Sequence, residues 1–110
     1  MTKTIPKPGR PVRGSRTGRA GNALFDLLGR RWALRVIWEL RDGRRLNFRD
    51  LLAACEIAPS VLNTRLAELR ETKIAEHGAE GYTLTRQGVT LLHLLMPLHD
   101  WAEDWAKTLK

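Results

Sequence analysis

The stretch that decides the fold runs from residue 57 to residue 71 and reads IAPSVLNTRLAELRE. Pro59 suits the first position of a helix, where its missing N–H would have no partner anyway. Leucines four and three residues apart then mark one buried helical face: Leu62, Leu66 and Leu69. The first two turns of the outer surface carry small uncharged polar side chains: Ser60, Asn63 and Thr64. Such a surface suits either solvent or close contact with another molecule, and the flanking elements decide between the two.

A second helix precedes this one closely. FRDLLAAC, residues 48–55, follows Asn47, which we expect to cap it, with Asp50 three residues on as in a shortened capping box. Glu56 and Ile57 are left to turn the chain. After the decisive stretch, KIAEH and YTLT flank GAEG, and two short extended runs around a four-residue loop predict a β-hairpin. A tight helix-turn-helix followed by a hairpin is the arrangement of a winged helix.

The remaining elements surround this unit. We expect a helix over 23–28 capped by Asn22 and stopped by Gly29, a helix over about 31–41, a short strand at 44–46, and a long helix over about 86–107 capped by Thr85. Residues 1–21 are rich in Pro, Gly and Arg and are expected to form a flexible arm. The predicted fold class is therefore mainly α with a small β-hairpin. It is a winged helix-turn-helix domain over 22–110, with dimerisation helices at its N- and C-terminal ends.

In a helix-turn-helix protein the second helix inserts its N-terminal half into the major groove of DNA. Small uncharged donors and acceptors can approach base edges there, and Asn matches the two edge groups of adenine. Glu68 and Glu71 come later on the outward side, where we expect weaker repulsion from phosphates. The competing interpretation is the solvated face of a core helix. The hairpin after the helix and the arginines before it count against that interpretation.

The net charge of +7 is unevenly placed. Residues 1–20 contain six Lys and Arg and no acid, and residues 30–49 contain seven Arg against Glu39 and Asp42. Such concentrated basic charge favours a polyanionic partner, nucleic acid before membrane, over a surface that only promotes solubility. Arg10 stands between Gly and Pro, which suits insertion into a narrow minor groove or looser attraction to phosphates.

Several other classes of protein find no support in the sequence. No apolar run approaches the ~18 residues needed to cross a membrane, and the N-terminus lacks the apolar stretch of a signal peptide. A single cysteine, Cys55, excludes an intrachain disulfide and fits a reducing cytoplasm. His99 and Glu103 have a spacing that could start a metal site, but the remaining ligands are missing. No catalytic constellation stands out, so we expect no enzyme, no metal and no cofactor.

The final helix carries an apolar stripe with a four-three spacing that is wider than one small domain covers. Its members are Leu91, Leu94, Leu95, Leu98, Trp101 and Trp105. We expect a helix of a second copy to cover this stripe, which makes these residues the predicted dimer interface. The alternative is that the first two helices of the same chain cover all of it.

Several stretches resemble the HxlR-type winged-helix transcriptional regulators of bacteria: ALFDLLGRRW, WELRDG, RRLNFRDLL, APSVLNTRLAELRE, YTLTRQG and LMPLHDWAEDWA. They span residues 23 to about 106, and their order and spacing agree with the family as well as the words do. The resemblance implies a small homodimer that presents a recognition helix and a wing from each subunit to a palindromic operator. It also implies a DNA-facing strip made of Ser60, Val61, Asn63, Thr64 and Arg65. Arginines complete the predicted DNA-binding set: Arg10, Arg13 and Arg49.

Two features depart from the family pattern. Many members carry a cysteine just before the first helix, used in some of them to sense oxidants or electrophiles, and Arg19 stands at that position here. Cys55 lies instead on the third predicted helix beside an apolar stripe, where we expect a buried structural thiol rather than a sensor. The tip of the wing contributes Glu80 and no Arg or Lys, so we expect the basic arm to supply the missing attraction to phosphates.

We therefore expect a cytoplasmic, sequence-specific transcriptional regulator. A repressor is the simpler expectation than an activator, because repression needs only occupation of a promoter. One alternative is a protein-interaction module with a basic solubility tail. Another is an RNA-binding accessory protein, which would need exposed aromatic rings. Besides the tryptophans only Phe25, Phe48 and Tyr82 are available, and we expect all three in the core. The sequence does not identify the operator, the regulated genes or any small-molecule effector.

Overall fold

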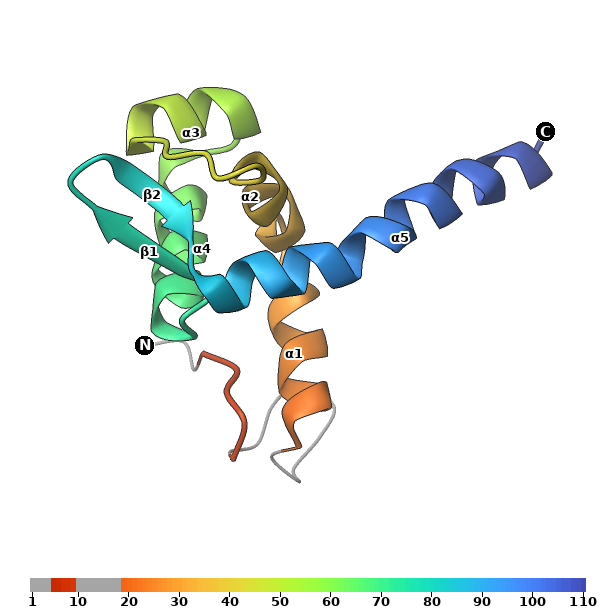
Figure 1. The fold of residues 1–110 in the computed structure, drawn as a ribbon, viewed down its shortest axis with the longest axis horizontal. Coiled ribbons are helices and arrows are strands. Elements are labelled where there is room, and N and C mark those ends of the chain that lie inside the picture. The colour runs from red at the N-terminus through yellow and green to blue at the C-terminus, as the bar shows by residue number, and fades with distance from the viewer. Residues whose placement is uncertain (1–4, 10–18) are drawn as a thin grey trace.

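The computed structural model describes residues 5–9 and 19–110. Its elements follow the predicted order of helices and hairpin (Figure 1). They are α1 (Ala20–Leu28), α2 (Ala33–Glu39), α3 (Phe48–Cys55), α4 (Pro59–Glu71), β1 (Ala75–Gly78), β2 (Gly81–Leu84) and α5 (Arg86–Thr108). The predicted class, mainly α with a small β-hairpin in a winged helix-turn-helix, is confirmed.

The helix pair α3–α4 forms as its capping residues predict. The side-chain oxygen of Asn47 accepts a hydrogen bond of 2.8 Å from the backbone N–H of Asp50, which satisfies one of the free donors at the start of α3. Glu56 takes a left-handed conformation with φ 55° and ends the helix. Pro59 occupies the first turn of α4. The turn between the two helices therefore has only three residues, 56–58.

The hairpin is tighter than expected. Strands β1 and β2 are antiparallel, and Gly78 pairs with Gly81, so only two residues form the loop where the sequence predicted four. Gly81 has φ +119°, and a Cβ there would lie 2.6 Å from the backbone of Leu46. This close approach allows Leu46 to form a single antiparallel bridge with Tyr82. The strand expected at 44–46 is reduced to that bridge.

The core lies between α2, α3, α4 and the base of the hairpin. Its most deeply buried large side chains are Val36, Ile37, Leu40, Leu51, Leu62, Leu66 and Leu69. The predicted leucine stripe of α4 is thus confirmed, with exposures of 1% or less. Each such side chain contributes about 1.5–3 kcal/mol through burial, so the stripe fixes which face of α4 points inward.

The N-terminal elements depart from expectation in three places. Helix α1 begins at Ala20, so Asn22 lies inside the helix instead of capping it. Helix α2 begins only at Ala33, because Trp32 has a left-handed φ of 73°. Phe25 is 72% exposed and not in the core. It stands two residues before the buried Leu27, about 200° around the helix, so it points away from the body.

Helix α5 packs on the domain mainly through its first half. The hydroxyl oxygen of Thr85 accepts a hydrogen bond of 3.1 Å from the N–H of Gly88 and caps the helix as predicted. Leu92 is buried, whereas every residue from Met96 to Lys110 is exposed. Figure 1 shows this second half running away from the body. In the described residues, no helix is long and apolar enough to cross a membrane.

Candidate nucleic-acid interface

The outer face of α4 presents the side chains that the sequence singled out. Ser60 and Asn63 are exposed, whereas Val61 and Thr64 are partly buried. The Thr64 hydroxyl donates a hydrogen bond of 2.9 Å to the carbonyl oxygen of Ser60, which leaves its oxygen lone pairs available as acceptors. The N-terminal half of α4 therefore offers hydroxyl and amide groups on a surface without charge. Such a surface can come close to base edges.

Arg65 lies apart from this polar face. Its side chain is only 12% exposed and is ion-paired with Glu68. Glu68 is itself 3% exposed, so its predicted outward position is wrong. Arg30, which follows α1, contacts the other carboxylate oxygen of Glu68. Because burial of an unpaired charge is costly, these two arginines explain how an acid can enter the edge of the core.

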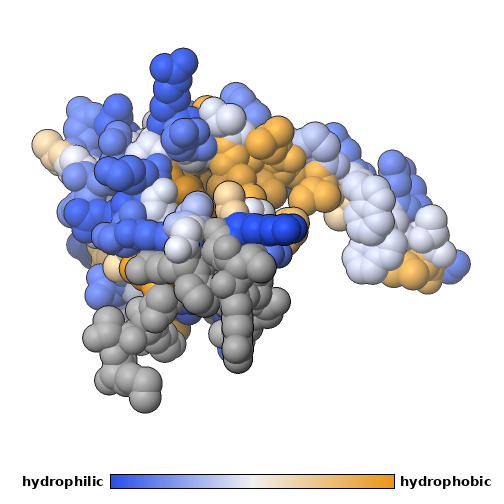
Figure 2. Space-filling view, turned by 90° about the horizontal axis from the view of Figure 1, so that it is seen from below, coloured by the Kyte–Doolittle hydropathy of each residue, from blue (hydrophilic) through white to orange (hydrophobic). Residues whose placement is uncertain are grey.

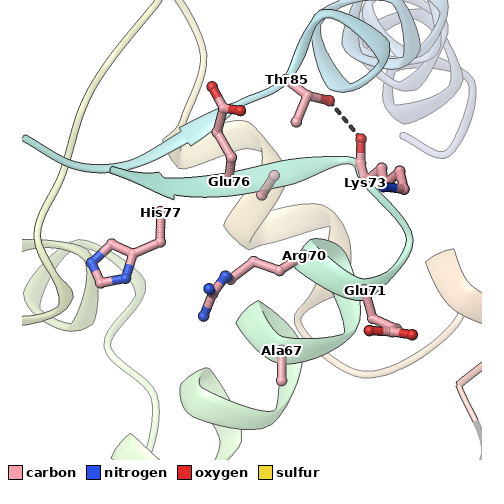
Figure 3. Close-up of a pocket in the computed structure, with 8 residues that line it drawn as sticks. Ala67, Arg70, Glu71, Lys73, Glu76, His77 and Thr85 are labelled. Atoms are coloured by element: carbon pink, nitrogen blue, oxygen red, sulfur yellow. Dashed lines mark hydrogen bonds between the residues drawn. The ribbon is translucent and has the colours of Figure 1, made fainter. Parts of the chain in front are cut away.

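A groove separates the C-terminal half of α4 from strand β1 (Figure 3). It has a volume of about 780 Å³ and is lined by Ala67, Arg70, Glu71, Lys73, Ala75, Glu76, His77 and Thr85. Arg70 projects from α4 into this groove towards the hairpin. The His77 ring stacks on Tyr82 with centroids 4.0 Å apart. The groove thus brings the basic Arg70 and Lys73 together with the acidic Glu71 and Glu76 at the junction of helix and wing.

The predicted interface did not include Arg70 or Lys73. A signal was present for Arg70, which follows Asn63 by seven residues and so shares its helical face. Lys73 offered no comparable signal. It lies beyond the end of α4, where the left-handed φ of 61° redirects the chain.

Two of the acids near the predicted interface have basic partners. Glu80, at the tip of the wing, lies 3.3 Å from Arg45. Glu71, at the end of α4, is ion-paired with Lys7 of the arm. Arg49 is exposed in the first turn of α3. Arg10 and Arg13 lie outside the described residues, so no contact can be assigned to them.

The predicted dimer stripe is largely open to solvent. Leu91 and Leu95 are partly buried against the domain, while the others are exposed: Leu94 71%, Leu98 60%, Trp101 61% and Trp105 51%. The two tryptophan rings stack with centroids 5.7 Å apart. Figure 2 shows apolar surface gathered where the projecting helix leaves the body. The first two helices of the same chain therefore do not cover the stripe. The exposed Phe25 on α1 adds an apolar group that was expected in the core.

Cys55 is a buried thiol, as predicted. It is 4% exposed. Burial raises the pKa of this thiol, the charge of Glu39 raises it further, and Arg35 lowers it. Among the described residues there is no group of His, Cys, Asp or Glu that could hold a metal ion. His99, considered above as a partner of Glu103, stacks instead on Trp38 with ring centroids 5.6 Å apart.

A helix pair that exposes polar groups on its second helix, followed by a two-stranded wing, defines a winged helix-turn-helix DNA-binding protein. Residues 27–110 match the family model described as HxlR-like helix-turn-helix, and the chain belongs to this family of transcriptional regulators. It is 30% identical to the HTH-type transcriptional regulator YodB of Bacillus subtilis (strain 168), over 76% of this chain and 80% of that protein. The crystal structure of quinone-bound YodB from B. subtilis superposes with a TM-score of 0.69 and 32% identity, covering 74% of this chain and 93% of that one.

Proposed function

We propose that this protein is a homodimeric repressor that binds an inverted-repeat operator through the polar face of α4. The observation that carries the proposal is the uncharged N-terminal half of α4, where Ser60 and Asn63 are exposed. Asn63 is the residue we assign to a base contact, since a side-chain amide can pair with both edge groups of adenine. Thr64 and Val61 lie beside it at the edge of the strip.

Basic side chains around α4 would hold the phosphate backbone. Arg49 on α3 and Arg70 near the end of α4 are both exposed. Arg10 and Arg13 are assigned to phosphates on charge alone. Arg65 has a different role in this proposal, because its ion pair with Glu68 withdraws it from the outer face. It stabilises the helix that carries the contact residues.

The dimer is supported by apolar surface that the monomer leaves open. Large apolar side chains in helical register are exposed on the projecting half of α5, and Phe25 is exposed on α1. Apolar patches of this kind on a small soluble domain mark interaction sites. A second copy is the occupant we propose, because α1 and α5 of one subunit would cover the same helices of the other around a two-fold axis.

The alternatives weighed from the sequence receive less support. An RNA-binding protein would stack bases on exposed aromatic rings. Tyr82 is 9% exposed and Phe48 is partly buried, and the exposed aromatic rings of Phe25, Trp101 and Trp105 belong to α1 and to the half of α5 that runs away from the body. Membership of a family of transcriptional regulators favours DNA over a protein-interaction module.

A small-molecule effector would bind without reacting with a thiol. The B. subtilis relative was solved in a quinone-bound form. In this chain a hollow of about 350 Å³ lies between the end of α2 and α5. Its apolar lining comprises Leu40, Leu84, Val89, Leu92 and Met96. Hollows of this size accommodate small aromatic molecules. A fully substituted quinone, which cannot alkylate cysteine, should therefore raise the Tm of the wild type but not of Val89→Trp, in which the hollow is filled. Equal shifts in both proteins would exclude this site.

The DNA-binding proposal is tested with single substitutions on DNA selected by the wild type. Asn63→Ala should reduce discrimination against mismatched operators by about 1–3 kcal/mol, and Thr64→Ala should reduce it in the same direction. Gln87→Ala is the matched control, because it removes an exposed amide at the start of α5. Unchanged discrimination in both α4 variants would refute the assignment of α4 as the recognition helix.

A further inference from the structure

We infer that Arg30 is a positioning residue that fixes the direction of the recognition helix α4 relative to α1, acting through Glu68. The inference rests on the proposed function, since it assigns α1 to the dimer and α4 to DNA. It goes further by naming the contact through which the spacing of the two half-sites is set.

The contact joins the two elements directly. Arg30 stands two residues after the end of α1, and its Nη1 atom contacts Oε2 of Glu68. Oε1 of the same carboxylate is ion-paired with Nη1 of Arg65, which lies one helical turn earlier on α4. Asp26, within α1, lies 3.6 Å from the Nη2 atom of Arg30. Both oxygens of Glu68 therefore have an arginine partner, one from the turn that follows α1 and one from α4 itself.

The four described side chains of this cluster are largely buried. The exposures of the side chains are 14% for Arg30, 12% for Arg65, 7% for Asp26 and 4% for Glu68. Among the described residues, the guanidinium groups of Arg30 and Arg65 thus meet the carboxylates of Asp26 and Glu68 at the edge of the core. In that environment the loss of one partner leaves an uncompensated charge, which is much more costly than the loss of a surface ion pair.

Directionality separates this contact from the leucine packing of α4. Burial of apolar surface is non-directional, so the stripe of Leu62, Leu66 and Leu69 tolerates small tilts of the helix. A charge-assisted hydrogen bond to a guanidinium has a preferred geometry and resists such tilts. Ser60 stands eight residues before Glu68, roughly 12 Å along the axis at 1.5 Å per residue. A tilt of about 10° at Glu68 then moves Ser60 by about 2 Å, more than a base-edge hydrogen bond can absorb.

The position of Arg30 gives this contact a consequence beyond stability. In the proposed dimer α1 lies near the two-fold axis, and each α4 reads one half-site. The Arg30–Glu68 contact is therefore repeated on both sides of the axis and fixes the separation of the two recognition helices. Loosening it should widen the range of half-site spacings that the dimer accepts, while a single half-site is still recognised.

Arg30→Met tests this against Arg31→Met as the matched control. Both variants lose one positive charge at adjacent positions, but Arg31 is exposed and lies over the Trp32 ring, 5.4 Å from its centroid. Affinity is measured for operators whose spacer differs by one base pair from the spacer that the wild type selects. The preference for the selected spacer should fall about 3- to 30-fold in Arg30→Met, the range of coupling between packed sites. It should change less than about twofold in Arg31→Met, as for a surface substitution.

The same substitution made in a Glu68→Gln protein distinguishes a positioning role of Arg30 from general destabilisation of the fold. Glu68→Gln keeps the shape of the side chain and should weaken the spacing preference as Arg30→Met does. Arg30→Met should then have no further effect on the preference in the Glu68→Gln protein. Arg30→Lys, which retains the charge, should restore part of the preference. If Arg30→Met does not fold, Arg30→Lys and Glu68→Gln carry the comparison. A spacing preference that survives in Glu68→Gln at wild-type strength would overturn the inference.

A measurement without DNA distinguishes this inference from the proposed function. Spin labels at Gly21 of α1 and Asn63 of α4, in Cys55→Ala protein diluted with unlabelled chain, report the distance between the two helices. Gly21 has no atom within 4 Å of an added Cβ, so the label is accommodated. The distance distribution should broaden in Arg30→Met and not in Arg31→Met. Equal distributions would refute the role of Arg30 even if the wild type binds an inverted repeat. Broadening in a protein that binds no inverted repeat would leave the Arg30 contact supported and refute the dimeric operator.

Discussion

Truncation of Trp105 to alanine should dissociate the dimer. Trp105 lies on the half of α5 that runs away from the body, and its ring stacks on Trp101. About half of its surface, 51%, is open to solvent in the monomer. If a second copy covers α5, this surface is removed from water only on association. The substitution therefore acts on the dimer and leaves the core of the winged helix unchanged.

The magnitude follows from the area that the partner would cover. A tryptophan buries up to about 250 Å², and half of that, about 125 Å², contributes about 3 kcal/mol at 25 cal/mol per Å². An isologous interface contains the residue twice, so the upper limit is about 6 kcal/mol per dimer. Truncation of a central interface residue often costs about 2–4 kcal/mol. We therefore expect the dissociation constant of the dimer to rise at least about 30-fold.

Sedimentation equilibrium measures this constant directly. Met96→Ala is the matched control, because Met96 is 41% exposed on the same helix but lies about 180° from Trp105 at 3.6 residues per turn. The control should dimerise like the wild type, whereas Trp105→Ala should sediment as a monomer at concentrations where the wild type is dimeric. The Trp105→Ala protein should also lose affinity for a full operator but not for a half-site. Equal dissociation constants in the three proteins would refute the assignment of α5 to the interface.

The remaining predictions concern the arm, the thiol and the base of the wing. Replacing Arg10 and Arg13 by alanine should flatten the log–log salt dependence of operator binding by about 0.9 for each phosphate that the arm no longer neutralises; an unchanged slope would separate the arm from DNA. Cys55 should react with iodoacetamide far more slowly than a free thiol at neutral pH, because a raised pKa keeps it protonated until the pH is higher than usual and because the side chain is buried. Alkylation at the rate of a free thiol would contradict that account. Gly88→Ala should lower the Tm strongly, because its Cβ would overlap the carbonyl oxygen before β1, while Gly78→Ala, with no atom within 4 Å of the added carbon, should leave the wing intact; similar Tm values for the two would show that α5 can shift to make room.

The parts of the fold that local chemistry determines could be predicted from the sequence. The leucine spacing of α4, the Asn47 and Thr85 caps and the Gly-bounded hairpin each depend on residues close in the chain. These features were sufficient to predict the order of elements and the class of the domain. The polar strip of α4 followed from the same periodicity, because the face opposite a buried stripe points outward.

The features that escaped prediction depend on partners distant in the chain. Glu68 was expected to face outward, since its angle on the helix is far from the leucines. Arg30, 38 residues earlier, covers it instead. A separate ion pair, between Arg65 and the same Glu68, withdraws Arg65 from the outer face. Phe25 was assigned to the core because large aromatic side chains are usually buried, but its helical angle places it opposite Leu27.

The boundary errors have a local cause that sequence patterns carry weakly. Trp32 adopts a left-handed φ of 73°, which delays the start of α2. Bulky residues rarely take that conformation, so no propensity indicated it. The hairpin loop was overestimated because Gly78 and Gly81 were expected in the turn, and they form its last paired residues instead.

The central claim is that the polar face of α4 reads DNA from two subunits related by a two-fold axis. Selection of bound duplexes from a random-sequence library by the full-length protein tests it most directly. The wild type should enrich an inverted repeat with half-site centres about 10 bp apart, or a multiple of that distance. The Asn63→Ala protein should relax the selected sequence at one position in each half-site. Recovery of a single unrepeated site, or of no enriched sequence at all, would contradict the claim.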